Sequence, residues 1–108
     1  MEKSKLMEEV KRIVHQAREE IRDADKYARC ALHYKIERPE FSRTYQNLAS
    51  AELEHMMMLH NLVGTLIEED RRTTGEPTPG MAEAYELIHD WQMDDVNEVK
   101  NLLQSARE

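Results

Sequence analysis

Apolar residues recur at alternating intervals of three and four residues through most of this chain, which is the spacing of one face of an α-helix. The pattern runs through residues 3–35 and again through 39–72, and only the short segment 37–40 interrupts it. Pro39 marks this break, because proline disfavours helical geometry in the residue before it and suits a first helical position. A connection this short places two helices side by side and antiparallel. The chain is therefore expected to form a long helical hairpin.

A third helix is expected at residues 81–106, after a linker at 73–80 that holds two of the three prolines and two of the three glycines. Of all residues, 40% are hydrophobic and 34% are charged, which is typical of helices with one buried and one solvated face. A length of 108 residues fits one domain. The expected fold is all-α, with one domain over 1–108 in which the third helix packs on the hairpin of 3–72.

Three ionisable residues interrupt the apolar faces of the two hairpin helices. Glu20 lies at the centre of the first face, and Glu52 and His55 lie three residues apart in the second. Residues equidistant from the bend face each other at about 1.5 Å rise per residue, and both possible pairings with Glu20 centre within one turn of the break. The two apolar stripes consist of Leu6, Ile13, Ala17, Glu20, Ala24, Tyr27, Ala31 and Tyr34, and of Phe41, Tyr45, Leu48, Glu52, His55, Leu59, Leu62 and Leu66.

These residue types at one level of two helices favour a metal site. Carboxylates bridge hard cations, and imidazole suits iron, manganese or zinc. The sequence therefore predicts a carboxylate-bridged site on the inner faces of the hairpin. The alternative is a metal-free network in which the Glu and His side chains hydrogen-bond each other and fix register or oligomeric state.

Glu20, Ala24 and Tyr27, followed about 25 residues later by the segment Glu52-Leu53-Glu54-His55, resemble the first half of the ferritin-like superfamily. The resemblance covers roughly residues 17–66 and is strongest to rubrerythrins and small two-helix encapsulated ferritins. In this family, one Glu from each of two helices and ExxH from each of the other two bind a di-iron or di-manganese centre. The resemblance implies that Glu20 is a terminal or bridging carboxylate, Glu52 the bridging carboxylate and His55 the nitrogen ligand.

One chain supplies half of such a ligand set, so a second copy is expected to complete a four-helix bundle and the site across a two-fold axis. The resemblance then implies a homodimer or higher homo-oligomer whose shared site holds two iron ions and oxidises Fe(II) with dioxygen or peroxide. Manganese or zinc is possible instead of iron. The chain has no CxxC pair of a rubredoxin-like domain, so electrons would come from an external donor. The alternative function is a metal-free helical dimer that acts as an adaptor for a protein partner.

Other polar residues are weaker candidates for the site. On the third helix, His89 lies within the apolar stripe and Glu86 near its edge, so both are possible additional ligands. Tyr27 and Asp23 are candidate outer hydrogen-bonding groups, against the ordinary alternatives of a core tyrosine and a solvated aspartate. Three further histidines point away from the stripes and are expected on the surface: His15, His33 and His60.

Charge and composition exclude several functional classes. A net charge of −7 argues against binding nucleic acid through its phosphates, which requires clustered Lys and Arg. No signal peptide and no run of about 20 apolar residues is evident, so a cytoplasmic, non-membrane protein is expected. The single cysteine, Cys30, excludes an internal disulfide and multi-cysteine metal sites. No hydrolase triad and no phosphate-binding glycine loop is present.

Overall fold

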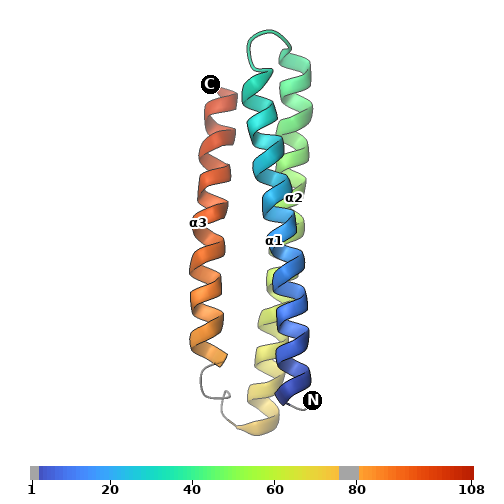
Figure 1. Ribbon diagram of the computed structural model, residues 1–108, viewed down its shortest axis with the longest axis vertical. Coiled ribbons are helices and arrows are strands. Elements are labelled where there is room, and N and C mark those ends of the chain that lie inside the picture. The colour runs from blue at the N-terminus through green and yellow to red at the C-terminus, as the bar shows by residue number, and fades with distance from the viewer. Residues whose placement is uncertain (1–2, 76–80) are drawn as a thin grey trace.

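The computed structural model describes the backbone of residues 3–75 and 81–108, with the side chains at all of these positions except 3, 4, 74, 81–85, 87, 88 and 91. It contains three helices, α1 (Lys3–His33), α2 (Pro39–Thr74) and α3 (Met81–Arg107), and no strand among the described residues. They form a rod of 57 × 18 × 16 Å (Figure 1). Its length matches a helix of 36 residues at about 1.5 Å per residue. The all-α prediction is confirmed for the described part of the chain.

The helix ends follow the expected sequence signals. α1 ends two residues before the expected position, and a turn over residues 34–37 leads to Pro39 in the first turn of α2. The buried hydroxyl of Ser42 donates to the carbonyl of Ala31 at 2.7 Å, which satisfies one of the carbonyls left open at the end of α1. α2 continues two residues past the expected end and stops at Gly75, whose N–H donates to the carbonyl of Arg71. Residues 76–80 of the expected linker lie outside the described residues.

Gly75 adopts a φ of 82°, in the left-handed region where an L side chain is strained. This conformation is typical of the residue that ends an α-helix. Glycine at this position therefore lets the chain leave α2 without steric cost.

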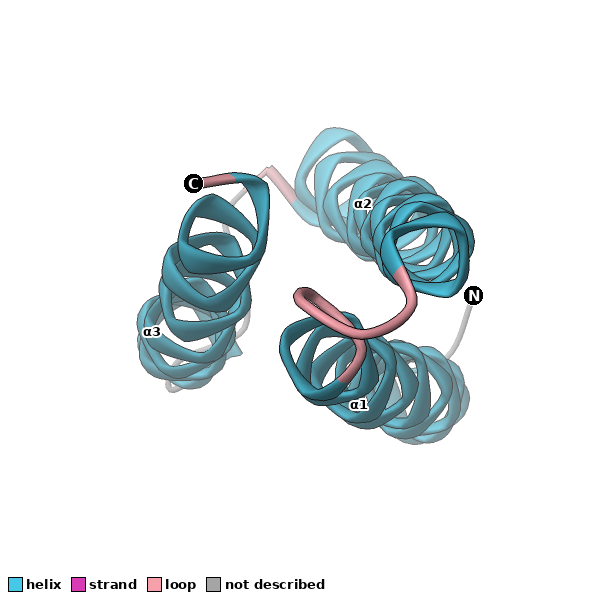
Figure 2. Cartoon of the chain, turned by 90° about the horizontal axis from the view of Figure 1, so that it is seen from above, coloured by secondary structure: helices cyan, strands magenta, loops and turns pink. Residues whose placement is uncertain are grey.

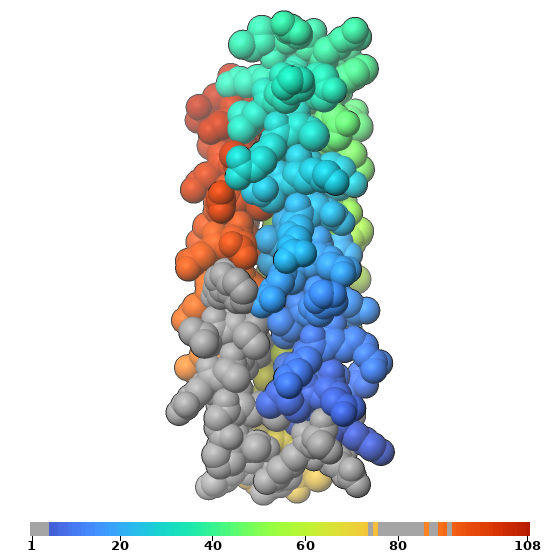
Figure 3. Space-filling model, viewed as in Figure 1, coloured from blue at the N-terminus to red at the C-terminus, as the bar shows by residue number. Residues whose placement is uncertain are grey.

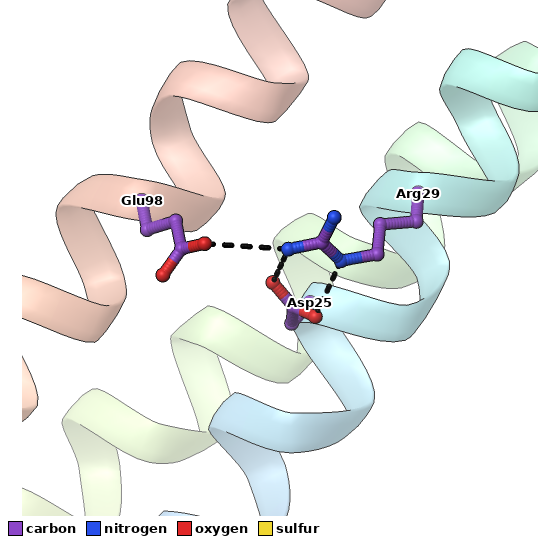
Figure 4. A network of polar contacts seen from close by, with 3 residues as sticks. All are labelled: Asp25, Arg29 and Glu98. Carbon is purple, nitrogen blue, oxygen red and sulfur yellow. Dashed lines mark hydrogen bonds and ion pairs between the residues drawn. The ribbon is translucent and has the colours of Figure 1, made fainter.

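α1 and α2 lie side by side and antiparallel, and α3 lies next to α1 and runs in the same direction (Figures 1 and 2). Viewed from the side, α1 lies in front, between α3 and α2 (Figure 3). Two polar contacts, one from α1 and one from the turn that follows it, reach the C-terminal half of α3. The Nζ of Lys35 donates to the carbonyl of Ser105 at 2.8 Å, and the guanidinium of Arg29 donates to Glu98 at 3.3 Å (Figure 4).

The core lies where α3 covers one side of the α1–α2 groove. Small residues of α1 let the helices approach closely, and the apolar side chains of α2 and α3 pack over them. The buried residues of these two clusters are Ala17, Ile21, Ala24, Ala28, Ala49, Met56, Val96, Val99 and Leu103. A third cluster of Leu6, Val10 and Val63 closes the lower end of the hairpin.

The expected apolar stripes match this core only in part. On α1, the structure buries Val10, Ile21 and Ala28, which lie outside the expected stripe. The reason is that α1 contacts both α2 and α3, so that it buries a broader face than one partner requires. On α2, the expected stripe forms the opposite side of the groove, and Phe41, Leu48 and Leu62 remain exposed there. We call this side the open face; it also includes the half-buried side chains of Tyr45, Leu59 and Leu66.

None of the helices is long and apolar enough to cross a membrane, as judged over the described residues.

Candidate metal centre

Glu20 of α1 and Glu52 and His55 of α2 meet on the open face. The Nδ1 of His55 lies 3.6 Å from the Oε2 of Glu20 and 3.9 Å from the Oε2 of Glu52. One ligand atom from each residue lies within 4.8 Å of the others, and this is the only such group of three found among the described residues. We call these residues the Glu–Glu–His group. The sequence predicts that these residues lie at the same height along the two helices, and in the structure they meet at that height.

The three side chains of the group differ in how far the single chain buries them. The side chain of Glu52 is 19% exposed and that of Glu20 is 29% exposed, whereas that of His55 is 55% exposed. The expectation that a second copy buries this stripe stays a prediction; in the single chain, His55 is the most exposed of the three residues. The physical reason is that α3 packs on the other side of the groove, through Met56 and Val96, and leaves His55 at the edge of the open face.

The spacing within the group is too wide for simple hydrogen bonds and suits a cation. Hydrogen bonds between nitrogen and oxygen span about 2.7–3.2 Å, and both contacts of His55 exceed this range. Oxygen and nitrogen ligands bind transition metals at about 2.0–2.2 Å, so that two donors of one ion lie at most about 4 Å apart. The two contacts of His55, at 3.6 and 3.9 Å, meet this limit. All three ligand atoms together lie within 4.8 Å, so a bound ion would draw the side chains slightly closer. Two carboxylates and an imidazole are also a donor set that iron, manganese and zinc accept.

Tyr27 belongs to a row of aromatic rings on the same face. Its ring lies 6.1 Å from that of Tyr45, which stacks on Tyr34 at 5.7 Å, and Tyr34 meets Phe41 edge-on at 5.4 Å. Among the described residues no hydrogen bond joins the Tyr27 hydroxyl to the Glu–Glu–His group, so its role as an outer hydrogen-bond donor stays a prediction. Asp23, the other candidate, is exposed.

The two candidate ligands of α3 do not join the Glu–Glu–His group. Glu86 is exposed, and His89 contacts His60 of α2 with 2.7 Å between its Nδ1 and the Nε2 of His60. α3 therefore covers the face opposite to the site.

His60 was expected on the surface, and this expectation is wrong because only 9% of the residue is exposed. His60 points toward α3 and contacts His89. Its burial could not be predicted, because the sequence pattern of α2 does not indicate on which side a helix that follows a linker will pack. The other two histidines, His15 and His33, are exposed as predicted.

Comparisons of this chain with protein-family models, with curated proteins and with solved structures find no match. Over the described residues, the fold and the Glu–Glu–His group define this chain as a helical protein with a candidate cation site.

Proposed function

We propose that this chain is a ferritin-like di-metal protein that binds Fe(II) and oxidises it with dioxygen or peroxide at a site shared between two copies of the chain. The single observation that carries this proposal is the meeting of Glu20, Glu52 and His55 within 4.8 Å on the open face. Three donors are half of the ligand set of a carboxylate-bridged metal pair. The same three residues of a second copy complete it.

The open face supports the two-copy arrangement. Exposed Leu48 and Leu62 lie seven residues to either side of His55, so apolar surface continues above and below the site. Such repeats of seven are the spacing at which helices pack against a partner helix. A two-fold axis through the site covers these side chains and brings four carboxylates around two divalent cations, which leaves no net charge on the set.

Each residue of the group has a separate task in this chemistry. Glu52 and His55 lie on successive turns of α2, so one rigid helix positions a bridging carboxylate and a nitrogen ligand. Glu20 comes from α1 and fixes the opposite side of the site. Fe(II) is the substrate: each of two ions loses one electron, and dioxygen accepts two electrons and two protons to give hydrogen peroxide. The two copies exclude bulk water from the site through the leucine and aromatic side chains around it.

The first test measures metal content and molar mass together, after reconstitution with Fe(II) and after chelation. We expect about two ions per dimer, and a ferric absorbance when oxygen is admitted to the Fe(II)-loaded protein. Glu52→Gln and His55→Ala should lose both signals. Glu54→Gln is the matched control, because Glu54 is exposed and lies on the same turn of α2. Unchanged metal content in Glu52→Gln and His55→Ala would overturn the assignment of the site.

The same exposed apolar side chains favour one second candidate, a metal-free helical dimer that acts as an adaptor. It differs from the first in a measurable way. An adaptor remains folded and dimeric after chelation and takes up no Fe(II), Mn(II) or Zn(II), and its Glu52→Gln variant behaves as the unmodified chain.

A further inference from the structure

Two tyrosines lie on the open face between the Glu–Glu–His group and the bend of the hairpin. On α1, Tyr27 follows Glu20 by seven residues. On α2, Tyr45 precedes Glu52 by the same number. Seven residues make about two helical turns, so each tyrosine shares a face with its glutamate and lies about 10 Å from it along the helix. The two phenol rings meet across the hairpin with their centroids 6.1 Å apart.

A third tyrosine continues this series of rings toward the surface at the bend. Tyr34 comes directly after the last residue of α1, and its ring stacks on that of Tyr45 with centroids 5.7 Å and planes 8° apart. Tyr34 also meets the exposed ring of His33 edge-on at 4.8 Å. All three tyrosines are half-buried. We call Tyr27, Tyr45 and Tyr34 the tyrosine row; it connects the surroundings of the metal site with the surface of the bend.

Phenol rings in contact can pass single electrons from one to the next. Tyrosine is among the few side chains that lose one electron readily, because the resulting phenoxyl radical is delocalised over the ring once the hydroxyl proton has left. Electron transfer slows steeply with distance, so several short steps are faster than one long step. The ring contacts of 6.1 and 5.7 Å divide the path into such steps. Phe41, which meets Tyr34 at 5.4 Å, has no hydroxyl and does not extend the path.

A half-filled metal site lacks one electron for the reaction with peroxide. Hydrogen peroxide is one of the two proposed oxidants and is also the product of dioxygen reduction, and it takes up two electrons when its O–O bond breaks. Two Fe(II) ions supply both electrons. A single Fe(II) supplies only one, and the products are then Fe(III), hydroxide and a hydroxyl radical. A site that binds its ions one at a time passes through this state during every loading.

We propose that the tyrosine row supplies the second electron to peroxide at a site that holds one Fe(II), and so prevents the release of hydroxyl radical. Fe(II) loses one electron, and Tyr27 or Tyr45 loses one electron and its hydroxyl proton. The O–O bond breaks, and the products are Fe(III), one water, one hydroxide and a tyrosyl radical. The radical then moves outward: Tyr34 passes an electron to the inner phenol and releases its hydroxyl proton to solvent, and the inner phenol is protonated again. This inference rests on the proposed function, because it requires iron at the Glu–Glu–His group.

The test is freeze-quench electron paramagnetic resonance on the full chain, loaded without oxygen to half of its measured Fe(II) capacity and then mixed with hydrogen peroxide. We expect the spectrum of a tyrosyl radical. The double variant Tyr27→Phe/Tyr45→Phe keeps both rings and removes both inner hydroxyls. It should lose the tyrosyl signal and raise the yield of hydroxyl radical that a spin trap captures. Phe41→Leu is the matched control, because it removes a ring that contacts the row and no phenol; it should behave as the unmodified chain.

Two results would overturn the proposal: no tyrosyl signal in the unmodified chain, or an equal signal in the double variant, as expected if the rings only pack against one another. Full loading with Fe(II) distinguishes this failure from a failure of the proposed function. With both ions bound, iron supplies both electrons, so the ferric absorbance should form to the same extent in the unmodified chain, the double variant and Phe41→Leu. A chain that takes up no Fe(II) refutes the proposed function and the electron path together. A ferric product without a tyrosyl radical at half loading refutes the electron path alone.

Discussion

At the scale of single residues, the burial of an α2 side chain depends on whether it faces the other two helices or the solvent. Met56 is fully buried between α1 and α3, whereas Met58, two positions later, is 66% exposed. The two residues have the same side chain and the same helix around them. Their difference in burial therefore isolates the contribution of packing.

We expect Met56→Ala to lower the free energy of unfolding by about 2–5 kcal/mol, because truncation of a buried side chain loses its transfer free energy and leaves a cavity. Met58→Ala should change it by less than about 0.5 kcal/mol, since exposed positions contribute little. Chemical denaturation followed by circular dichroism measures both. Equal losses in the two variants would contradict the position of α3 on the Met56 side of the hairpin.

At the scale of the helices, the sequence predicted the elements well because their ends depend on local chemistry. Pro39 and Gly75 act within one turn of the chain, and the helices end within two residues of the expected positions. The level of Glu20 against His55 was equally predictable, since a hairpin with one short turn has one register. The side on which α3 packs was not predictable, because α2 is apolar on two sides and its sequence favours neither. The burial of His60 and the exposure of His55 both depend on that choice.

The end of α2 offers a prediction at this scale. A Cβ at Gly75 meets no atom within 4 Å, so Gly75→Ala introduces backbone strain and no steric clash. We expect it to lower the free energy of unfolding by about 1–2 kcal/mol, the cost of a left-handed conformation for an L residue. Gly75→Asn should lose less, because asparagine tolerates this conformation. If alanine and asparagine were equivalent, the helix would end in another conformation in solution.

At the scale of the whole molecule, the open face is apolar surface that a single chain leaves exposed and that an assembly would cover. A rod 16–18 Å wide with three helices leaves exposed apolar side chains along one side of α2. The metal-site proposal and the adaptor alternative both assign a partner to this side. The sequence pattern showed an apolar stripe there but carried no information on whether the same chain or another covers it.

Leu48→Glu is expected to convert the proposed dimer to monomer, because a charge at the centre of an apolar contact is left without a partner. The helical content of each chain should persist, since Leu48 is 39% exposed in the single chain. Met57→Glu is the control: Met57 is 42% exposed, but it points to the opposite side of α2 and should leave the dimer intact. Sedimentation velocity at several concentrations measures both. If Met57→Glu dissociated the dimer and Leu48→Glu left it intact, the interface would have to lie on the Met57 side of α2.

The turn over residues 34–37 has a further consequence for the order of folding. Contacts between α1 and α2 next to this turn join residues close in sequence, such as the hydroxyl of Ser42 with the carbonyl of Ala31, eleven residues away. Contacts of α3 with α1 span about seventy residues, as from Arg29 to Glu98, which are 69 residues apart. Chain entropy makes short loops close first. We expect the hairpin to form early from its turn and α3 to dock in a later step, so that nascent chains present both sides of the α1–α2 groove to their surroundings before the third helix is in place.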